Sequence, residues 1–451
     1  MERDANLKDN YLYLYYYHPL GEKVSTVRDD LLYGKKSVGV IGLGFIGTTT
    51  AMAFAQKGIK VIGYDINPKK IKSYKKGICN VMNLEKWMMA DIKTYVDSKI
   101  FIPTNKFEDI VDCPVHFIAV PTHNNTTGKP YKGFVEKVLN DLLDKTETQL
   151  IFIESTIEPS WIDYLGLTRS PVCVAPRRDW FANPMLNINT MTRVWSANKE
   201  VRELSNDILS IICKSLIEAS SMKVACLGGK DVENAILHVV AVACQQLANA
   251  YDININEVLE LVSTHPRMMK VYPNIKVGGY CVPLGSEYVV GGANRPEELS
   301  IFKQAIEYNE ATSKRISSQL LKNRELKKIA LLGVTYKNDL KVDTLSATHT
   351  FAHFLNEKAS IHDPYYNKKE IKKLFNVDML KYPDDLKDFD AIIILTDHRL
   401  YSETPIKDIL ENVKKDALIL DALGVWEKVK EDFPNYYRYG NCNIFEIKKG
   451  T

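Results

Sequence analysis

The sequence lacks the features that mark several classes of protein. Its eight cysteines include no CxxC pair and are scattered over 451 residues, which argues against a disulfide scaffold and against a zinc site. The 59 basic and 56 acidic residues leave a net charge of only +3, so the composition implies no nucleic-acid partner. No apolar run reaches membrane-spanning length, and no signal-peptide pattern opens the chain. We therefore expect a cytoplasmic protein without a metal site or a membrane partner.

A glycine turn between a strand and a helix predicts a dinucleotide site. Residues 37–67 read as an apolar strand, a glycine turn, a small-residue helix and a second strand. In this context the first glycine makes the tight turn, the second admits a pyrophosphate to the helix N-terminus, and the third lets the helix pack on the strand. The residues predicted to bind the cofactor here are Gly42, Gly44 and Gly47, with the intervening Phe45 and Ile46.

Asp65 ends the second strand, where a carboxylate accepts hydrogen bonds from an adenosine ribose. This position favours NAD over NADP as the cofactor. Lys69 and Lys70 follow closely and weaken the exclusion of a 2′-phosphate.

Beyond this turn, apolar strands alternate with helices. Further strands are predicted at 115–122 and 149–157, with an amphipathic helix near 134–144. Such alternation predicts a doubly wound parallel sheet, whose ligands bind beyond the carboxyl ends of the strands. Residues at two of these ends are predicted to contact the cofactor, although hydroxyls that only cap the strands are an alternative. These residues are Val120, Pro121, Thr122, Ser155 and Thr156.

The middle of the chain is predicted to be mainly helical. The expected elements are a helix and a short strand (222–228) within 201–228, and helices at 229–251, 254–263 and 297–323. A spacing of four residues places Lys230, Asn234 and His238 on one face of the long helix. This polar face indicates a pocket or, alternatively, an ordinary solvated surface.

One cysteine stands in a stretch with the residues of an exposed loop. Gly278 and Gly279 precede Cys281, and Pro283 follows it. The glycines permit a tight turn and the proline stiffens the exit, so we expect a loop that presents the thiol. On these residues alone, a buried structural cysteine is the simpler interpretation.

A second series of strands and helices begins at Lys328, where Gly333 lacks the other glycines of a dinucleotide fingerprint. The fold class is therefore predicted to be α/β, with two Rossmann-like, doubly wound parallel-sheet domains joined by a central helical segment with a long helix. The predicted divisions are an N-terminal extension (1–35), an NAD-binding domain (36–200), a central helical domain (201–323) and a C-terminal α/β domain (324–451). The tyrosine-rich run at 11–17 could be a short strand or an arm on another subunit.

The order of these motifs resembles the UDP-glucose and UDP-N-acetylmannosamine 6-dehydrogenase family over residues 36–440. The matching motifs are G-x-G-x-x-G at 42, VPT at 120, EST-x-x-P at 154, Lys230 with Asn234, GG-x-C-x-P at 278, Tyr336-Lys337, Asp363-Pro364 and LTDH at 395. The resemblance implies an NAD domain, a central domain that dimerises through the helix at 229–251, and a C-terminal domain that binds the UDP of a nucleotide sugar. A homodimer is therefore expected.

The resemblance also implies a reaction. In the family, NAD oxidises the C6 alcohol of a sugar to an aldehyde, a cysteine adds to it as a thiohemiacetal, a second hydride leaves, and water hydrolyses the thioester. By resemblance, Cys281 is the nucleophile, Lys230 the cation beside the developing oxyanion and Asn234 its orienting amide. Thr156 holds a catalytic water. The expected substrate-binding residues are Lys230, Asn234, Gly278, Gly279, Tyr336 and Lys337.

Several positions depart from the family's pattern. Arg177 stands where the family usually has the glutamate of Pro-Glu-Arg, and Gly285 stands where it has an aspartate. Thr344 or Leu345 occupies the place of a substrate-binding arginine, and His123 replaces a proline after VPT. Three charged positions are therefore altered together.

These changes leave three interpretations open. The first is oxidation of a UDP-hexose or UDP-N-acetylhexosamine to the uronate, or a truncated reaction, because Arg177 cannot act as a base. The second is a catalytically impaired relative that binds NAD or a nucleotide sugar as a regulator or scaffold. The third is a pocket re-tuned by Arg177, Arg178 and Arg267 for an extra anionic group, unless the arginines form ion pairs. The carboxylates that could replace the lost groups are Asp179, Asp231 and Glu287.

Overall fold

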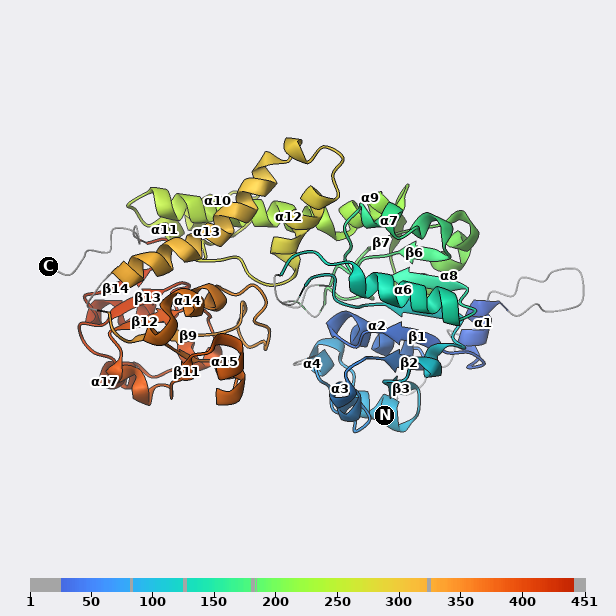
Figure 1. Ribbon diagram of the computed structural model, residues 1–451, viewed down its shortest axis with the longest axis horizontal. Coiled ribbons are helices and arrows are strands. Elements are labelled where there is room, and N and C mark those ends of the chain that lie inside the picture. Colours follow the sequence, from blue (N-terminus) through green and yellow to red (C-terminus); the bar gives the residue numbers. More distant parts are fainter. Residues whose placement is uncertain are drawn as a thin grey trace, which may run out of the picture.

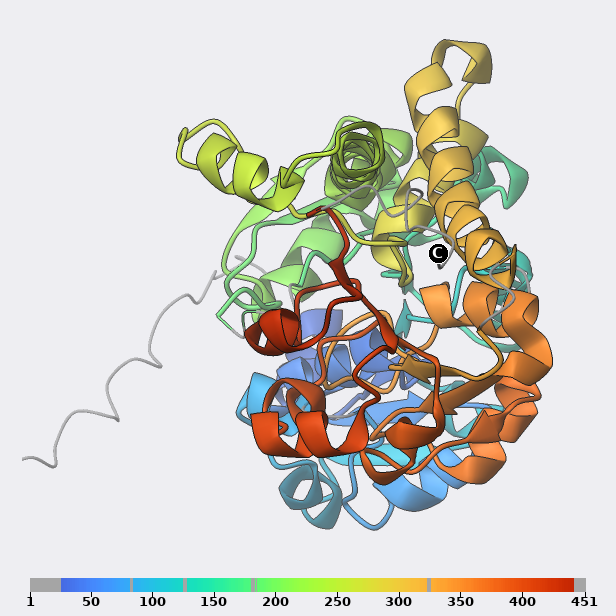
Figure 2. The same cartoon turned by 90° about the vertical axis from the view of Figure 1, so that its left-hand side faces the viewer.

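Two parallel-sheet domains lie at opposite ends of the molecule, and the long helices α10 (Val232–Ala250) and α13 (Ser300–Lys322) run over them (Figure 1). The computed structural model describes residues 26–81, 84–124, 128–179, 183, 185–322 and 326–441. In the view turned by 90°, α10 is seen nearly end-on with α13 beside it (Figure 2). The predicted α/β class, with two Rossmann-like domains and a helical centre, is confirmed. The tyrosine-rich run at 11–17 lies outside the described residues.

The first sheet has eight strands in the order β3-β2-β1-β4-β5-β6-β7-β8. Its strands are β1 (Val38–Ile41), β2 (Val61–Tyr64), β3 (Phe101–Thr104), β4 (Val115–Ile118), β5 (Leu150–Ile153), β6 (Val172–Val174), β7 (Arg193–Ala197) and β8 (Leu216–Glu218). Neighbouring strands are parallel except for β6 and β7, which are antiparallel. β8 lies after residue 200, so this sheet extends into the segment predicted as central.

The helices of the first domain lie in the connections between successive strands, except for the first, which precedes β1. They are α1 (Val27–Leu32), α2 (Phe45–Ala55), α3 (Pro68–Tyr74), α4 (Leu84–Met88), α5 (Ile92–Asp97), α6 (Gly133–Lys145), α7 (Trp161–Tyr164) and α8 (Arg202–Ile212). Every residue of β1, β4 and β5 is buried, as expected for a parallel sheet with both faces covered. Successive β5 side chains enter two different apolar clusters, because side chains alternate between the faces of a strand.

The central segment corrects two expectations. Its other helices are α9 (Met222–Cys226), α11 (Ile255–Val262) and α12 (Cys281–Gly291). Residues 222–228 were expected to form a strand, which is wrong: Ser221 caps α9 by accepting a hydrogen bond from the backbone of Val224. The expected loop after Cys281 is also wrong, because Cys281 begins α12. Pro283 fits the first turn of this helix, where a backbone N–H has no partner within the helix.

The second sheet has six parallel strands in the order β11-β10-β9-β12-β13-β14. They are β9 (Ile329–Leu332), β10 (Ala359–His362), β11 (Asp378–Met379), β12 (Ala391–Ile394), β13 (Leu418–Asp421) and β14 (Tyr436–Arg438). Its helices are α14 (Ala347–Leu355), α15 (Lys368–Phe375), α16 (Arg399–Ser402) and α17 (Ile406–Asn412). In both sheets the strand order reverses beside the first strand, which places the ligand crevice there.

Candidate active site

The glycine turn after β1 has the geometry of a dinucleotide cradle. Gly42 has a φ of +90°, and an added Cβ would lie 2.6 Å from the carbonyl oxygen of Ala119. A Cβ on Gly47 would lie 1.8 Å from the carbonyl oxygen of Gly42, so both positions require glycine. Around Gly44, which precedes α2, a Cβ would meet no atom within 4 Å. This open space at a helix N-terminus fits a pyrophosphate group.

Asp65 is oriented by the same turn. Its Oδ2 accepts a hydrogen bond from the backbone N of Leu43 at 2.9 Å, and its Oδ1 accepts one from the backbone N of Asn67 at 2.9 Å. Lys70 Nζ lies 2.6 Å from Oδ2 and forms an ion pair with the carboxylate. The carboxylate is therefore fixed beside the cradle, where it can accept hydrogen bonds from a ribose.

The ends of β4 and β5 are joined by side-chain contacts. Ser155 Oγ donates a hydrogen bond to the carbonyl oxygen of Val120 at 2.7 Å. Thr122 Oγ1 and the hydroxyl of Tyr288 lie 2.8 Å apart, which links β4 to α12. Pro121 is exposed and Thr156 is half-buried. The predicted residues at these two strand ends thus lie at one edge of the sheet.

Lys230 lies in a π-helical turn, Leu227–Asp231, at the start of α10. Its Nζ donates a hydrogen bond to the carbonyl oxygen of Arg177 at 2.9 Å, and Asn234 Nδ2 donates one to the carbonyl oxygen of Lys230 at 3.0 Å. Asn234 and His238 are buried, so the polar face of this helix is not a solvated surface. Short π-helical turns occur frequently at functional sites.

Cys281 is the first residue of α12, and its side chain is exposed. Glycines before it allow close contact with the C-terminal domain, because a Cβ on Gly279 would lie 2.7 Å from the ring of Tyr336. The backbone N of Gly279 donates a hydrogen bond to the carbonyl oxygen of Thr344 at 2.9 Å. The thiol is therefore presented where the central and C-terminal domains meet, and a buried structural cysteine is excluded.

The structure brings some predicted residues together and leaves others apart. Gly278, Gly279 and Tyr336 are in direct contact, whereas Lys337 is half-buried in the loop that follows Tyr336. Within the described part of the chain, no hydrogen bond or ion pair joins Cys281 to Lys230 or Thr156. Their shared role in a reaction stays a prediction.

Arg177, which the resemblance places at the position of a glutamate, is buried among polar and charged side chains. It is 2% exposed, and its guanidinium donates hydrogen bonds to Thr50 Oγ1 at 2.6 Å and Thr49 Oγ1 at 3.0 Å. Its Nε lies 2.7 Å from Asp179 Oδ2, and Nη1 lies 3.8 Å from Glu154 Oε1. These buried acidic groups raise the pKa of Arg177 against the effect of burial.

The other two arginines do not converge with Arg177 on an anion site. Arg178 forms an ion pair with Glu233 at 3.2 Å, and Arg267 is exposed. The ion-pair interpretation therefore accounts for Arg177 and Arg178.

Gly285, which the resemblance places at the position of an aspartate, lies where α12 contacts α10 closely. An added Cβ would lie 2.5 Å from Cβ of Asn234 and 2.8 Å from the backbone N of Ala235. One residue further, Ser286 Oγ lies 2.9 Å from His238 Nδ1. The glycine thus lets α12 lie directly against α10.

Asp231 is a buried carboxyl group whose environment the sequence did not reveal. It is fully buried, and neither of its carboxylate oxygens has a hydrogen-bond partner among the described residues. Burial raises its pKa to about 8; nearby Lys230 opposes this shift and Glu158 adds to it.

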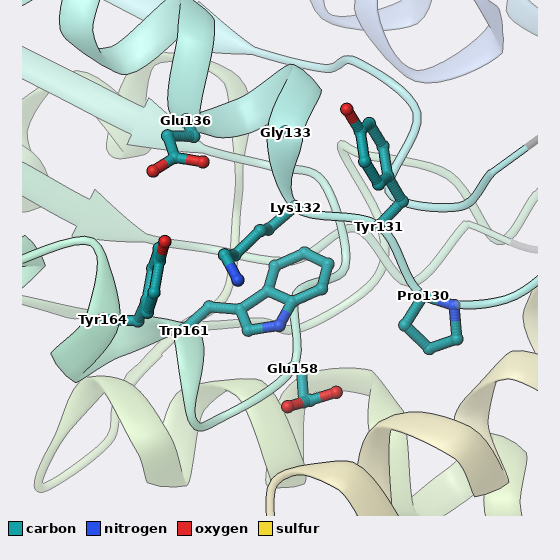
Figure 3. Close-up of a pocket in the computed structure, with 8 residues that line it drawn as sticks. All are labelled: Pro130, Tyr131, Lys132, Gly133, Glu136, Glu158, Trp161 and Tyr164. Carbon is teal, nitrogen blue, oxygen red and sulfur yellow. The ribbon is translucent and has the colours of Figure 1, made fainter.

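A pocket of about 380 Å³ lies beyond β4 and β5, at the start of α6 (Figure 3). Lys132 Nζ lies 3.7 Å from the centroid of the Tyr164 ring, and Figure 3 shows it between that ring and Trp161. The lining residues are Pro130, Tyr131, Lys132, Gly133, Glu136, Glu158, Trp161 and Tyr164. None of the residues predicted from the sequence lines it, so this pocket is separate from the predicted site.

Three domain models of one family match the chain in order. They are the NAD binding domain of the UDP-glucose/GDP-mannose dehydrogenase family at residues 36–167, its central domain at 229–311 and its UDP binding domain at 330–428. The match includes the glycine turn in the first domain, Lys230 and Cys281 in the second, and Tyr336 in the third.

Individual relatives agree with these models. A UDP-N-acetyl-D-mannosamine dehydrogenase of Methanococcus aeolicus is 25% identical over 85% of this chain and 90% of its own length. The corresponding enzyme of Methanocaldococcus jannaschii is 27% identical over 87% of this chain and 94% of its own length. The similarity therefore covers all three domains.

Solved structures share the fold. The structure of a UDP-D-ManNAc dehydrogenase from Pyrococcus horikoshii has a TM-score of 0.74 at 21% identity, covering 90% of this chain and 100% of its own. A UDP-glucose dehydrogenase from Pyrobaculum islandicum has a TM-score of 0.74 at 19% identity, covering 92% and 98%. The motifs, the site geometry and the ordered domain models lead to one conclusion: the chain belongs to the UDP-glucose/GDP-mannose dehydrogenase family.

Proposed function

We propose that this NAD-dependent dehydrogenase oxidises the C6 alcohol of a UDP-hexose or UDP-N-acetylhexosamine to the uronate through Cys281. The observation that carries the proposal is the exposed Cys281 thiol at the start of α12, in contact with the UDP-binding domain through Gly279 and Tyr336. The names of the curated relatives, which act on UDP-N-acetylmannosamine or UDP-N-acetylglucosamine, support this substrate class.

The cofactor is NAD, and the glycine cradle fits its pyrophosphate. In our proposal Gly42, Gly44, Phe45, Ile46 and Gly47 hold the pyrophosphate, and Asp65 accepts hydrogen bonds from the adenosine ribose. The residues proposed to line the nicotinamide end are Val120, Pro121, Thr122, Ser155 and Thr156. Bound NAD accepts a hydride from the sugar carbon in each oxidation step.

The chain's own residues perform the remaining chemistry. Cys281 adds to the aldehyde, Lys230 stabilises the oxyanion that forms, and Asn234 orients it. Thr156 positions the hydrolytic water. The residues proposed to bind the nucleotide sugar are Lys230, Asn234, Gly278, Gly279, Tyr336 and Lys337.

The assembly and the compartment are also proposed. Val232, Ile236 and Leu247 on α10 expose apolar side chains, which supports a homodimer through this helix. The seven cysteines in the described residues are free thiols, which supports a reducing, cytoplasmic location. No helix in the described ranges is long and apolar enough to cross a membrane.

Cys281→Ser tests the proposed reaction. The purified wild-type chain, given NAD with UDP-N-acetylmannosamine, UDP-N-acetylglucosamine or UDP-glucose, is expected to form two NADH and one uronate per sugar consumed. Without the thiol, no thioester forms, so Cys281→Ser is expected to lose at least about 100-fold of the uronate-forming rate. Cys79→Ser, which removes a partly buried thiol in the loop after α3, serves as the matched control. Absence of NADH with every UDP-sugar would defeat the proposal.

A further inference from the structure

We propose that His123 is the proton acceptor of the cysteine site and replaces the acidic groups that the chain lacks at positions 177 and 285. The chemical role rests on the function proposed above, whereas its contact with the cysteine segment is a property of the fold. His123 would take the thiol proton of Cys281 and, in the hydrolytic step, a proton of the attacking water.

The place of His123 in the sheet supports this role. The strand order reverses between β1 and β4, and His123 follows β4 directly after Val120, Pro121 and Thr122. Ligands of doubly wound sheets bind in the crevice at this reversal, beyond the carboxyl ends of the strands. His123 is 6% exposed and pairs with Pro130 through an isolated β-bridge, so the backbone at His123 has a defined partner.

The loop that carries His123 packs against the beginning of α12. The imidazole lies with its ring centroid 4.4 Å from that of Tyr280, at an interplanar angle of 47°. Tyr280 immediately precedes Cys281. Two further contacts hold the same loop on α12: Thr122 bonds to Tyr288, and Lys129 forms an ion pair with Glu287.

The positions of the two missing acidic groups are closed to replacement. Arg177 is buried in ion pairs with Asp179 and Glu154, and its guanidinium contacts α2. At Gly285, the contact with Asn234 leaves no space for a side chain. A group that acts as a base must therefore come from another element.

The carboxylates nearby are engaged or enclosed. Asp179 is 1% exposed at its side chain and lies 2.7 Å from Arg177 Nε, and Glu287 is paired with Lys129. Asp231 is fully buried, and burial raises its pKa to about 8. Among these candidates, His123 alone belongs to the strand end that forms the ligand crevice.

Imidazole suits the required chemistry because it exchanges protons near neutral pH. When the Cys281 sulfur bonds to the aldehyde carbon, the thiol proton passes to His123, and the carbonyl oxygen becomes the thiohemiacetal alkoxide. As the second hydride passes to NAD⁺, this oxygen re-forms a carbonyl in the thioester, and His123 releases its proton to solvent. Water then attacks the thioester carbon and gives a proton to the neutral His123. When the C–S bond breaks, His123 returns this proton to the leaving sulfur.

A pH measurement must distinguish the effect of His123 from that of the other ionisable groups on the elements packed against it. Tyr280 contacts the imidazole, Cys281 and Glu287 lie on α12, and Lys129 forms an ion pair with Glu287. Asp343 of the C-terminal domain acts on Tyr280, whose pKa is raised mainly by burial. A single substitution at His123 leaves all of these groups in place.

The first test measures the alkylation of Cys281 by iodoacetamide against pH, quantified on the Cys281 peptide by mass spectrometry. We expect the wild-type chain to react at least about 10-fold faster than His123→Gln at pH 6.5, because the thiolate is the reactive form and a proton acceptor beside the thiol favours it. His353→Gln, an exposed histidine on α14, is the matched control and should behave as wild type. Equal alkylation rates for wild type and His123→Gln across the pH range would overturn the proposal.

The second test follows NADH and uronate formation in the same variants. His123→Gln is expected to lose about 100-fold or more of kcat and the acidic limb of its pH profile, because a general base contributes about 10²–10⁴. His123→Asn provides a second variant if His123→Gln does not fold. If the wild type forms no NADH, the proposed function fails while the alkylation test still stands; if turnover is intact in both His123 variants, the base role alone fails.

Discussion

Asp231 has a carboxyl group whose ionisation is disfavoured in the folded chain. Its carboxyl group is fully buried between α9, α10 and α12, and burial raises its pKa to about 8. The unfolded chain ionises an aspartate near pH 3.9, so the folded chain binds one more proton between about pH 4 and 8. Stability therefore falls as the pH rises through this window.

Asp231→Asn removes this titration. The variant should gain stability relative to the wild type as the pH rises, with a difference about 2–4 kcal/mol larger at pH 8.5 than at pH 5. Urea unfolding at the two pH values measures it. Asp207→Asn on the exposed face of α8 is the control, and an equal effect of Asp231→Asn at both pH values would contradict the assigned pKa.

Arg177 shows which residue properties the sequence could not supply. Its neighbour Asp179 lies two residues further along the chain, but its partners Thr49 and Thr50 lie on α2, more than a hundred residues away. Burial and pairing of this kind arise only when the sheet is assembled. By contrast, the residues of the glycine turn could be assigned from sequence because their geometry is local.

At the level of elements, the contact between α10 and α12 is the closest helix packing near the site. The backbone of Gly285 approaches Asn234 so closely that a Cβ would fall within 2.5 Å. His238 and Ser286 add a hydrogen bond at 2.9 Å across the same interface. The position of Cys281, one turn before Gly285, depends on this contact.

Gly285→Ala is expected to destabilise the protein by about 1–3 kcal/mol, because the new methyl group must push the helices apart. Gly44→Ala, whose methyl group would meet open space, is the matched control for stability, although it should weaken NAD binding. Thermal unfolding of both variants without cofactor makes the comparison. An unchanged midpoint for Gly285→Ala would mean that α12 is free to shift.

Helices whose apolar residues recur at helical spacing were predicted correctly. Segments whose residues suit more than one kind of structure were not. The helices near 134–144, 229–251 and 254–263 correspond to α6, α10 and α11. The apolar residues of α9 also suit a strand. Only Ser221, which caps the helix, favours a helix over a strand in this segment. α12 was missed because glycine and proline are read as loop residues, although proline is tolerated in a first turn.

For the whole molecule, the exposed apolar residues of α10 are the basis of the proposed dimer. Ile236 is 48% exposed at the middle of these residues. Ile236→Lys should therefore shift a wild-type dimer towards monomer in multi-angle light scattering, because charges at the centre of such an interface are strongly disfavoured. Lys199→Ala, at an exposed residue that follows β7, is the control. A wild-type monomer would refute the dimer itself.

The domain order was predictable from sequence because each motif series is continuous, whereas the assembled site was not. Gly279 meets Tyr336, and Thr122 meets Tyr288, across large separations in the chain. Such contacts depend on how the domains pack, which no local pattern encodes. The roles of Cys281, Lys230 and Thr156 stay predictions until the reaction is measured.

Gly285 limits how the site can be engineered. This backbone does not accommodate an aspartate at position 285, because the new Cβ would lie 2.8 Å from the backbone N of Ala235. Placing a carboxylate there requires α10 to shift or a second substitution in α10. An attempt to add an acidic group to this site therefore has to begin with α10 or at another position.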